Sequence, residues 1–122
     1  MSMAKTYALV FGIAYVAVAI LELLFKNVGG LLFFTPVHNA VHWLTGVLGL
    51  AAYGMGDKSA MMYAKIFGVV FTLVAILGFV APDFLGSILG YRVNMFYNLV
   101  HTVTGLAGLY VGFMGMKKPM SA

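Results

Sequence analysis

The twelve residues NAVHWLTGVLGL at positions 39–50 recur as NLVHTVTGLAGL at positions 98–109, with seven of the twelve letters identical. A second match accompanies them, because FGIAYVAVAIL at 11–21 corresponds to FGVVFTLVAIL at 67–77. Each match keeps a constant offset along its length, and the two offsets differ by three positions. Such a difference fits an insertion in a connecting loop, where insertions are tolerated. The sequence therefore predicts an internal duplication.

Each copy contains two long apolar runs. A hydrocarbon core of about 30 Å is crossed by a helix of about 20 residues. Four runs reach this length, and they are residues 6–25, 36–55, 60–80 and 95–114. We expect an all-α membrane fold over residues 1–122, a single domain in which four transmembrane helices form two tandem helical-hairpin repeats. Repeat one covers about 6–55 and repeat two about 60–114, related by a pseudo-two-fold axis along the membrane normal.

The composition is typical of a membrane protein. Of the 122 residues, 63% are hydrophobic and only 8% are charged, whereas a soluble domain carries roughly 25% charged residues. The net charge of +4 comes from a few groups near the ends of the apolar runs. This placement is typical of membrane topology signals and not of a nucleic-acid surface. The absence of cysteine excludes disulfides and thiolate metal ligands.

Polar residues mark the ends of the predicted helices. Thr35, which is followed by a proline, and Asn94 are each expected to cap the amino terminus of a helix. The stretch 84–93 is expected to form a short interfacial helix, with Tyr91 and Arg92 at the level of the lipid headgroups.

The basic residues predict the orientation in the membrane. Short loops on the cytoplasmic side carry more Lys and Arg. With the amino terminus inside, the residues on the inner side are Lys5, Lys58, Lys65, Lys117 and Lys118. The outer side then carries Lys26 and Arg92. We therefore expect both termini in the cytoplasm, in a bacterial inner membrane or a photosynthetic membrane.

A stripe of polar and small residues runs along each of the second and fourth spans. Its members are Asn39, His42, Thr45, Gly46, Gly49, Asn98, His101, Thr104, Gly105 and Gly108. Small residues let helix backbones approach closely, and polar side chains hydrogen-bond across the contact. We expect spans two and four to pack on each other through this seam, with the Asn and Thr side chains satisfying the imidazoles. Leu48 and Ala107 are expected to face lipid.

The spacing N-x-x-H-x-x-x-G-x-x-G occurs in both copies, beginning at Asn39 and at Asn98. With this motif in its second and fourth spans, the chain resembles the DUF4383-like proteins, a bacterial family of short four-helix membrane proteins described as a domain of unknown function. The resemblance covers nearly the whole chain. It implies the fold and the membrane location, and it implies no activity.

His42 and His101 are candidate cofactor ligands. Each lies seven residues past its cap, which places both roughly 9 Å along parallel helices. Two imidazoles at equal depth can bind one haem, or each can bind one chlorophyll-type magnesium. The neighbouring glycines would make room for the macrocycle. The competing interpretation, which we favour, is helix packing with no cofactor.

A single metal ion is a further alternative. His38 and His42 are four residues apart on one helix face, a spacing that lets two imidazoles bind one ion, and His101 and Glu22 would complete the set. However, His38 has no histidine counterpart in the second copy and is expected at the wet membrane surface. Glu22 is the only acidic residue inside a predicted span. It is expected either to pair with Lys26 or to orient His42.

The sequence contains no evident catalytic constellation, because it lacks a nucleophile with an adjacent base, paired carboxylates and a phosphate-binding loop. We therefore expect no enzyme but a non-catalytic accessory or scaffold protein within or beside a larger membrane complex, for which respiratory and photosynthetic assemblies are candidates. Its expected partners are membrane lipid and other integral membrane subunits or further copies of itself, and no nucleic acid. A His-ligated tetrapyrrole-binding protein and a small-solute or proton transporter are the alternatives.

Overall fold

Helices account for most of the computed structural model, which describes residues 2–25, 27–28, 32–33, 35–89 and 93–114. The long helices are α1 (Met3–Phe25), α2 (Pro36–Met55), α3 (Asp57–Val80) and α5 (Met95–Leu109). A π-helical turn, η1 (Tyr110–Met114), continues α5.

Short elements connect the long helices. Helix α4 (Pro82–Leu89) lies between α3 and α5. Strands β1 (Asn27–Val28) and β2 (Leu32–Phe33) pair antiparallel between α1 and α2. This two-residue ladder was not expected from the sequence.

The helix bounds agree closely with the prediction. α2 has the predicted bounds, whereas α1 begins at Met3 and not at residue 6, and α3 begins at Asp57 and not at residue 60. α5 and η1 together cover the fourth predicted run. The helix expected at 84–93 is α4, and Tyr91 and Arg92 lie outside the described residues.

Both predicted helix caps are confirmed. The side-chain oxygen of Thr35 accepts a hydrogen bond from the backbone N–H of His38 at 3.2 Å. The side-chain oxygen of Asn94 accepts one from the backbone N–H of Tyr97 at 3.0 Å. Each cap satisfies a backbone donor that the first turn of a helix leaves without a partner.

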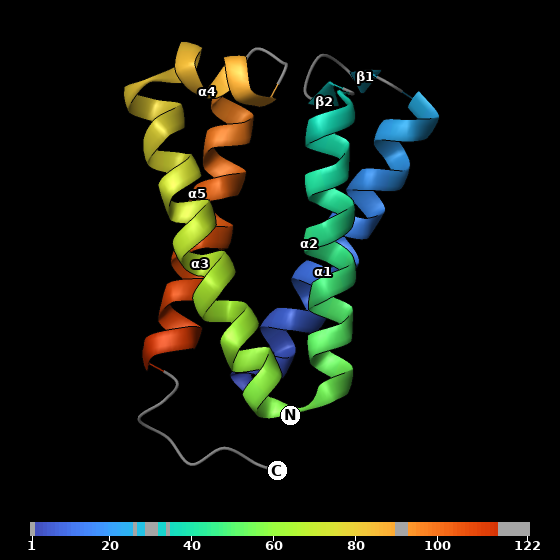
Figure 1. The fold of residues 1–122 in the computed structure, drawn as a ribbon, viewed down its shortest axis with the longest axis vertical. Helices are drawn as coiled ribbons and strands as arrows, with labels where there is room; N and C mark the ends of the chain where they lie inside the picture. Colours follow the sequence, from blue (N-terminus) through green and yellow to red (C-terminus); the bar gives the residue numbers. More distant parts are fainter. Residues whose placement is uncertain (1, 26, 29–31, 34, 90–92, 115–122) are drawn as a thin grey trace.

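The four long helices form two antiparallel hairpins (Figure 1). α1 packs along α2, and α3 packs along α5. The hairpins meet near the end where α2 turns into α3 and separate toward the end that carries α4 and the strands. Gly56 makes this turn with a φ of 114°, a left-handed conformation that side chains larger than glycine disfavour.

Close backbone contact at glycine holds each hairpin together. A Cβ atom added to Gly46 would lie 2.7 Å from the backbone nitrogen of Val16 in α1. One added to Gly105 would lie 2.5 Å from the backbone nitrogen of Thr72 in α3. Gly46 and Gly105 are aligned positions of the two similar sequence segments, and so are Val16 and Thr72. The same contact therefore occurs once in each hairpin.

The prediction that spans two and four pack on each other through the stripe is wrong. The stripe faces the antiparallel partner, α1 for α2 and α3 for α5, and no extensive contact joins α2 to α5 within the described residues. The reason is the close approach of the helix backbones at glycine, because Gly46 lies against α1 and Gly105 lies against α3. Ala107, expected to face lipid, packs against the buried core, whereas Leu48 is exposed.

Two tyrosine hydroxyls join one hairpin to the other. Tyr7 of α1 donates to the carbonyl oxygen of Thr104 in α5 at 2.9 Å. Tyr63 of α3 donates to the carbonyl oxygen of Thr45 in α2 at 2.8 Å. The two tyrosines occupy aligned positions of the similar sequence segments, as do the two threonines, so these hydrogen bonds correspond to each other.

Each of these hydroxyls lies against a glycine. A Cβ atom on Gly49 would lie 2.8 Å from the hydroxyl oxygen of Tyr63, and one on Gly108 would lie 2.7 Å from that of Tyr7. Both glycines come one helical turn after the threonine whose carbonyl accepts the bond. A larger residue would displace the tyrosine.

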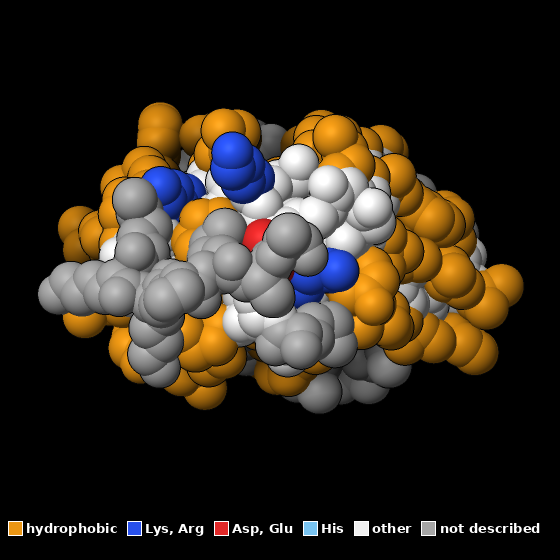
Figure 2. Space-filling view, turned by 90° about the horizontal axis from the view of Figure 1, so that it is seen from below, with side chains coloured by type: hydrophobic (Ala, Val, Ile, Leu, Met, Phe, Trp, Pro, Cys, Tyr) orange, Lys and Arg blue, Asp and Glu red, His pale blue; other side chains and the backbone are white. Residues whose placement is uncertain are grey.

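Polar contacts close the end at which α1 begins. Ser2 hydrogen-bonds the carboxylate of Asp57, and the ammonium of Lys5 lies 5.1 Å from the centre of the Tyr53 ring. Figure 2 shows lysine side chains gathered on this end. The lysines within the described residues are Lys5, Lys58 and Lys65, whereas Lys26, Arg92, Lys117 and Lys118 lie outside them.

Among the described helices, α1 and α3 are long and apolar enough to cross a membrane. Only 28% of the apolar window of α1 and 33% of that of α3 are buried inside the protein. Less than half of each apolar window is therefore buried inside the protein. α2 also has 20 residues, but its stripe of polar side chains lowers its hydropathy.

One added methyl group at the glycine contacts is expected to destabilise the fold. Gly46→Ala and Gly105→Ala put a Cβ atom under 3.0 Å from backbone atoms of the facing helix, and overpacking typically costs about 1–3 kcal/mol. Gly54→Ala, also in α2, is the matched control, because its added Cβ meets nothing within 4 Å. Helix propensity predicts that it stabilises by up to about 1 kcal/mol. Unfolding in detergent measures these changes, and equal stability of all three variants would contradict the close helix contact.

Candidate functional site

Aromatic rings fill the space where the two hairpins diverge. Tyr15 of α1 and Phe71 of α3 stack with ring centroids 5.3 Å apart. The His42 ring lies 5.4 Å from Tyr15, and the His101 ring lies 5.5 Å from Phe71. Tyr15 and Phe71 are aligned positions of the similar sequence segments, and so are the two histidines. The predicted cofactor ligands therefore make equivalent contacts with one central aromatic stack.

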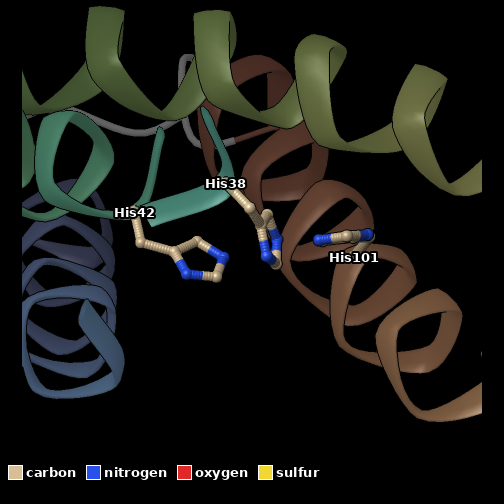
Figure 3. Close-up of side chains that lie close together, drawn as sticks. All are labelled: His38, His42 and His101. Carbon is tan, nitrogen blue, oxygen red and sulfur yellow. The ribbon is translucent and has the colours of Figure 1, made fainter. Parts of the chain in front are cut away.

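His38 lies between His42 and His101 (Figure 3). Its ring centroid is 3.9 Å from that of His42 and 6.3 Å from that of His101. One ring nitrogen of each histidine lies within 4.8 Å of the others. The expectation that His38 lies at a wet surface is wrong, since only 1% of the residue is exposed. Its ring points into the bundle and packs edge-on against Tyr97 at 5.2 Å.

A single carboxylate lies beside these imidazoles. Oε1 of Glu22 is 2.9 Å from Nδ1 of His42, and Oε2 is 3.6 Å from Nδ1 of His38. The amide of Asn39 donates to the same Oε1 at 3.1 Å and to the carbonyl oxygen of Ala19 at 3.0 Å. Glu22 is 1% exposed, and a carboxylate at such depth requires donors of this kind.

The second hairpin departs from the first at this point. Gly78 stands at the position equivalent to Glu22, and Tyr97 at the position equivalent to His38. The amide of Asn98 donates to the carbonyl oxygen of Gly78 at 3.1 Å. A Cβ atom on Gly78 would collide with the amide oxygen of Asn98. The polar cluster is therefore built mainly from the first hairpin, and α5 adds His101.

Contrary to the prediction, the Asn and Thr side chains of the stripe donate their hydrogen bonds, within the described residues, to other groups and not to the imidazoles. The hydroxyls of Thr45 and Thr104 donate to carbonyls of their own helices, at Val41 and Val100, over 2.7 and 2.9 Å. The asparagine amides donate to Glu22 and to backbone carbonyls. Nδ1 of His101 is buried and has no hydrogen-bond partner within the described part of the chain.

The room expected for a flat macrocycle is occupied by the protein. The four glycines of the stripe face α1 and α3, and the nearest atom to an added Cβ lies between 2.5 and 2.8 Å away. The ring of His38 lies between the two histidines that a haem would join. This geometry suits a single ion better than a tetrapyrrole.

A family model matches residues 5–114 of the chain and is described as Domain of unknown function (DUF4383). The chain belongs to this family. The matched region of this DUF4383 protein includes the whole histidine cluster and Glu22. No curated protein and no solved structure matches the chain. Because the family has no established activity, a function must be argued from the residues themselves.

The sequence predicted that Glu22 and the three histidines could lie together, but it did not predict the aromatic residues packed beside them. Of the two partners considered for Glu22, the structure gives His42, and Lys26 lies outside the described residues. Tyr15 and Phe71 were not singled out, although they occupy equivalent positions in the matched segments. The constant offset between the matched segments was the available signal, because it aligns Tyr15 with Phe71.

Removal of the Glu22 carboxylate is expected to destabilise the protein. Glu22→Ala leaves the Asn39 amide and the His42 ring without their shared acceptor, and a buried donor without a partner costs about 1–3 kcal/mol. Glu22→Gln retains an acceptor oxygen and should lose less. Asp83→Asn, at an exposed acid in α4, should change stability by no more than about 0.5 kcal/mol. Thermal unfolding in detergent provides the measurement. Wild-type stability of Glu22→Ala would show that the carboxylate is not needed as an acceptor.

Proposed function

We propose that this DUF4383 protein crosses a membrane four times, through α1, α2, α3 and the continuous α5–η1 segment. The four helices form two tandem helical-hairpin repeats around a pseudo-two-fold axis along the membrane normal. In the membrane the protein acts as a non-catalytic accessory subunit that packs beside a larger membrane complex.

The observation that carries this proposal is the apolar outer face of every long helix. One side chain near the middle of each helix is more than half exposed, namely Ile13 at 55%, Leu44 at 58%, Leu73 at 56% and Val103 at 61%. A continuous apolar surface of this kind favours aggregation in water, whereas lipid tails solvate it. The polar side chains of the stripe point inward, as intramembrane polar residues do.

The equivalent contacts support the tandem repeat. The glycine contacts, the tyrosine hydrogen bonds and the histidine–aromatic contacts each occur once per hairpin, at constant offsets in sequence. A two-helix unit repeated in the same direction gives an axis parallel to the helices.

The ends of the hairpins support an orientation. The described lysines lie at the end where α1 begins, and basic residues favour the cytoplasmic side. At the other end, α4 buries Leu85 and exposes Phe84 and Ile88. A short helix with such exposed apolar side chains suits the boundary between headgroups and acyl chains.

The accessory role is supported by the surface available to a partner. Gly56 alone separates α2 from α3, and the other connections are too short to form a soluble domain. The outer helix faces are therefore the main surface for recognition, and membrane helices associate through such faces.

The orientation can be tested by cysteine labelling, because the chain contains no cysteine. Ser87→Cys in α4 is expected to react with a membrane-impermeant maleimide in intact spheroplasts. Lys58→Cys, at the opposite end, should react only after the membrane is opened. Both native side chains are exposed. Labelling of Lys58→Cys in intact spheroplasts would contradict the orientation, and extraction of the protein by alkaline carbonate would contradict membrane integration.

The accessory role can be tested by crosslinking. A photoreactive amino acid at Leu44 or Val103 is expected to capture a different integral membrane protein in native membranes, because both side chains point away from the bundle. The unsubstituted chain is the control. Crosslinks that form only to a second copy of the chain would show self-association and contradict the accessory role. Recovery of the uncrosslinked monomer alone would contradict the accessory role and self-association alike.

A further inference from the structure

We propose that His38, His42 and His101 bind one divalent first-row transition-metal ion, with Glu22 as the anion that orients the histidines. This inference goes beyond the scaffold role and does not depend on it, since all four side chains lie in the interior of the bundle. The bound ion would tie α2 of one hairpin to α5 of the other.

The positions of the three ring nitrogens suit one ion. They lie within 4.8 Å of one another. Ion–nitrogen distances near 2.0–2.1 Å place two ligands of the same ion about 3–4 Å apart, so the three rings would move closer together on binding the ion. His38 and His42 come from successive turns of one helix, and His101 comes from the facing hairpin.

The hydrogen bonds around the rings prepare them as ligands. When Nδ1 of His42 donates to Oε1 of Glu22 at 2.9 Å, its Nε2 is left with a free lone pair. Such a carboxylate–histidine pair sets the tautomer and orientation of metal-bound histidines. Nδ1 of His101, buried without a hydrogen-bond partner in the described residues, is a nitrogen that a metal would satisfy.

Two of the differences between the similar segments lie in this cluster. His38 replaces the tyrosine of the second hairpin, and Glu22 replaces its glycine. The contacts that hold the hairpins together are equivalent in both halves. The contacts that hold the hairpins together therefore do not depend on either of these two differences. Both departures add a nitrogen ligand or a negative charge at the same place.

The donor set selects the class of ion. Imidazole nitrogens suit Zn²⁺, Cu²⁺, Fe²⁺ and Ni²⁺, whereas Mg²⁺ and Ca²⁺ prefer sets of oxygen ligands. The buried carboxylate of Glu22 offsets part of the charge of a divalent ion in a low-dielectric interior.

The test uses the full chain in detergent, loaded with Zn²⁺ and then desalted. Mass spectrometry of the metal is expected to find one ion per chain, and Zn²⁺ is expected to raise the unfolding temperature. Co²⁺ is expected to give ligand-field bands in the visible spectrum. His101→Ala should lose the ion, and Glu22→Gln should bind it about 10–100-fold more weakly.

Tyr15→Phe controls for a general effect on the fold. It removes the hydrogen bond between Tyr15 and the hydroxyl of Thr104 while leaving the three imidazoles in place. It should therefore lose stability and keep the ion. Equal loss of the ion in Tyr15→Phe and His101→Ala would overturn the assignment of His101 as a ligand. A wild-type protein that retains no Zn²⁺, or that carries a Soret band instead, would overturn the site.

Discussion

Two tyrosine hydroxyls, each lying over a glycine of the opposite hairpin, couple the two halves of the chain. Because Tyr7 bonds the carbonyl of Thr104 and Tyr63 bonds that of Thr45, neither hairpin can slide along the other without breaking both bonds. In the membrane location that we propose, apolar burial gives little attraction between helices, and close packing with interhelical hydrogen bonds takes its place. This coupling sets where the hairpins touch and where they diverge, and hence the space that the aromatic and histidine rings fill.

Local chemistry explains why the helix bounds could be predicted and the helix partners could not. The caps at Thr35 and Asn94 act within one turn, so sequence is sufficient to place them. The similar segments align residues at a constant offset, but the alignment does not say which helix these residues face. A seam between α2 and α5 and a seam inside each hairpin satisfy the same offsets. Only the close contacts of Gly46 and Gly105 with α1 and α3 distinguish them.

The residues of the candidate site could be predicted from the sequence, but the direction in which the His38 side chain points could not. Spacing and depth grouped three histidines with Glu22, and the structure brings these side chains together. The direction of His38 did not follow from its position, because a side chain in the first turn can point to the helix end or inward. Its contact with Tyr97 on the other hairpin decides this. That contact depends on how two distant helices meet, which no local pattern in the sequence contains.

If both hairpins carried the same residues in this interior, the electrostatic free energy of the folded protein would be less favourable. Glutamate at both equivalent positions would bury two carboxylates in one small bundle, where like charges raise each other's cost of ionisation. Glycine at position 78 avoids this, and the amide of Asn98 fills the space that its missing side chain leaves. One carboxylate remains, shared by His42 and Asn39. The two similar helix pairs thus differ at one level, and this difference concentrates the negative charge and the nitrogen donors at one place.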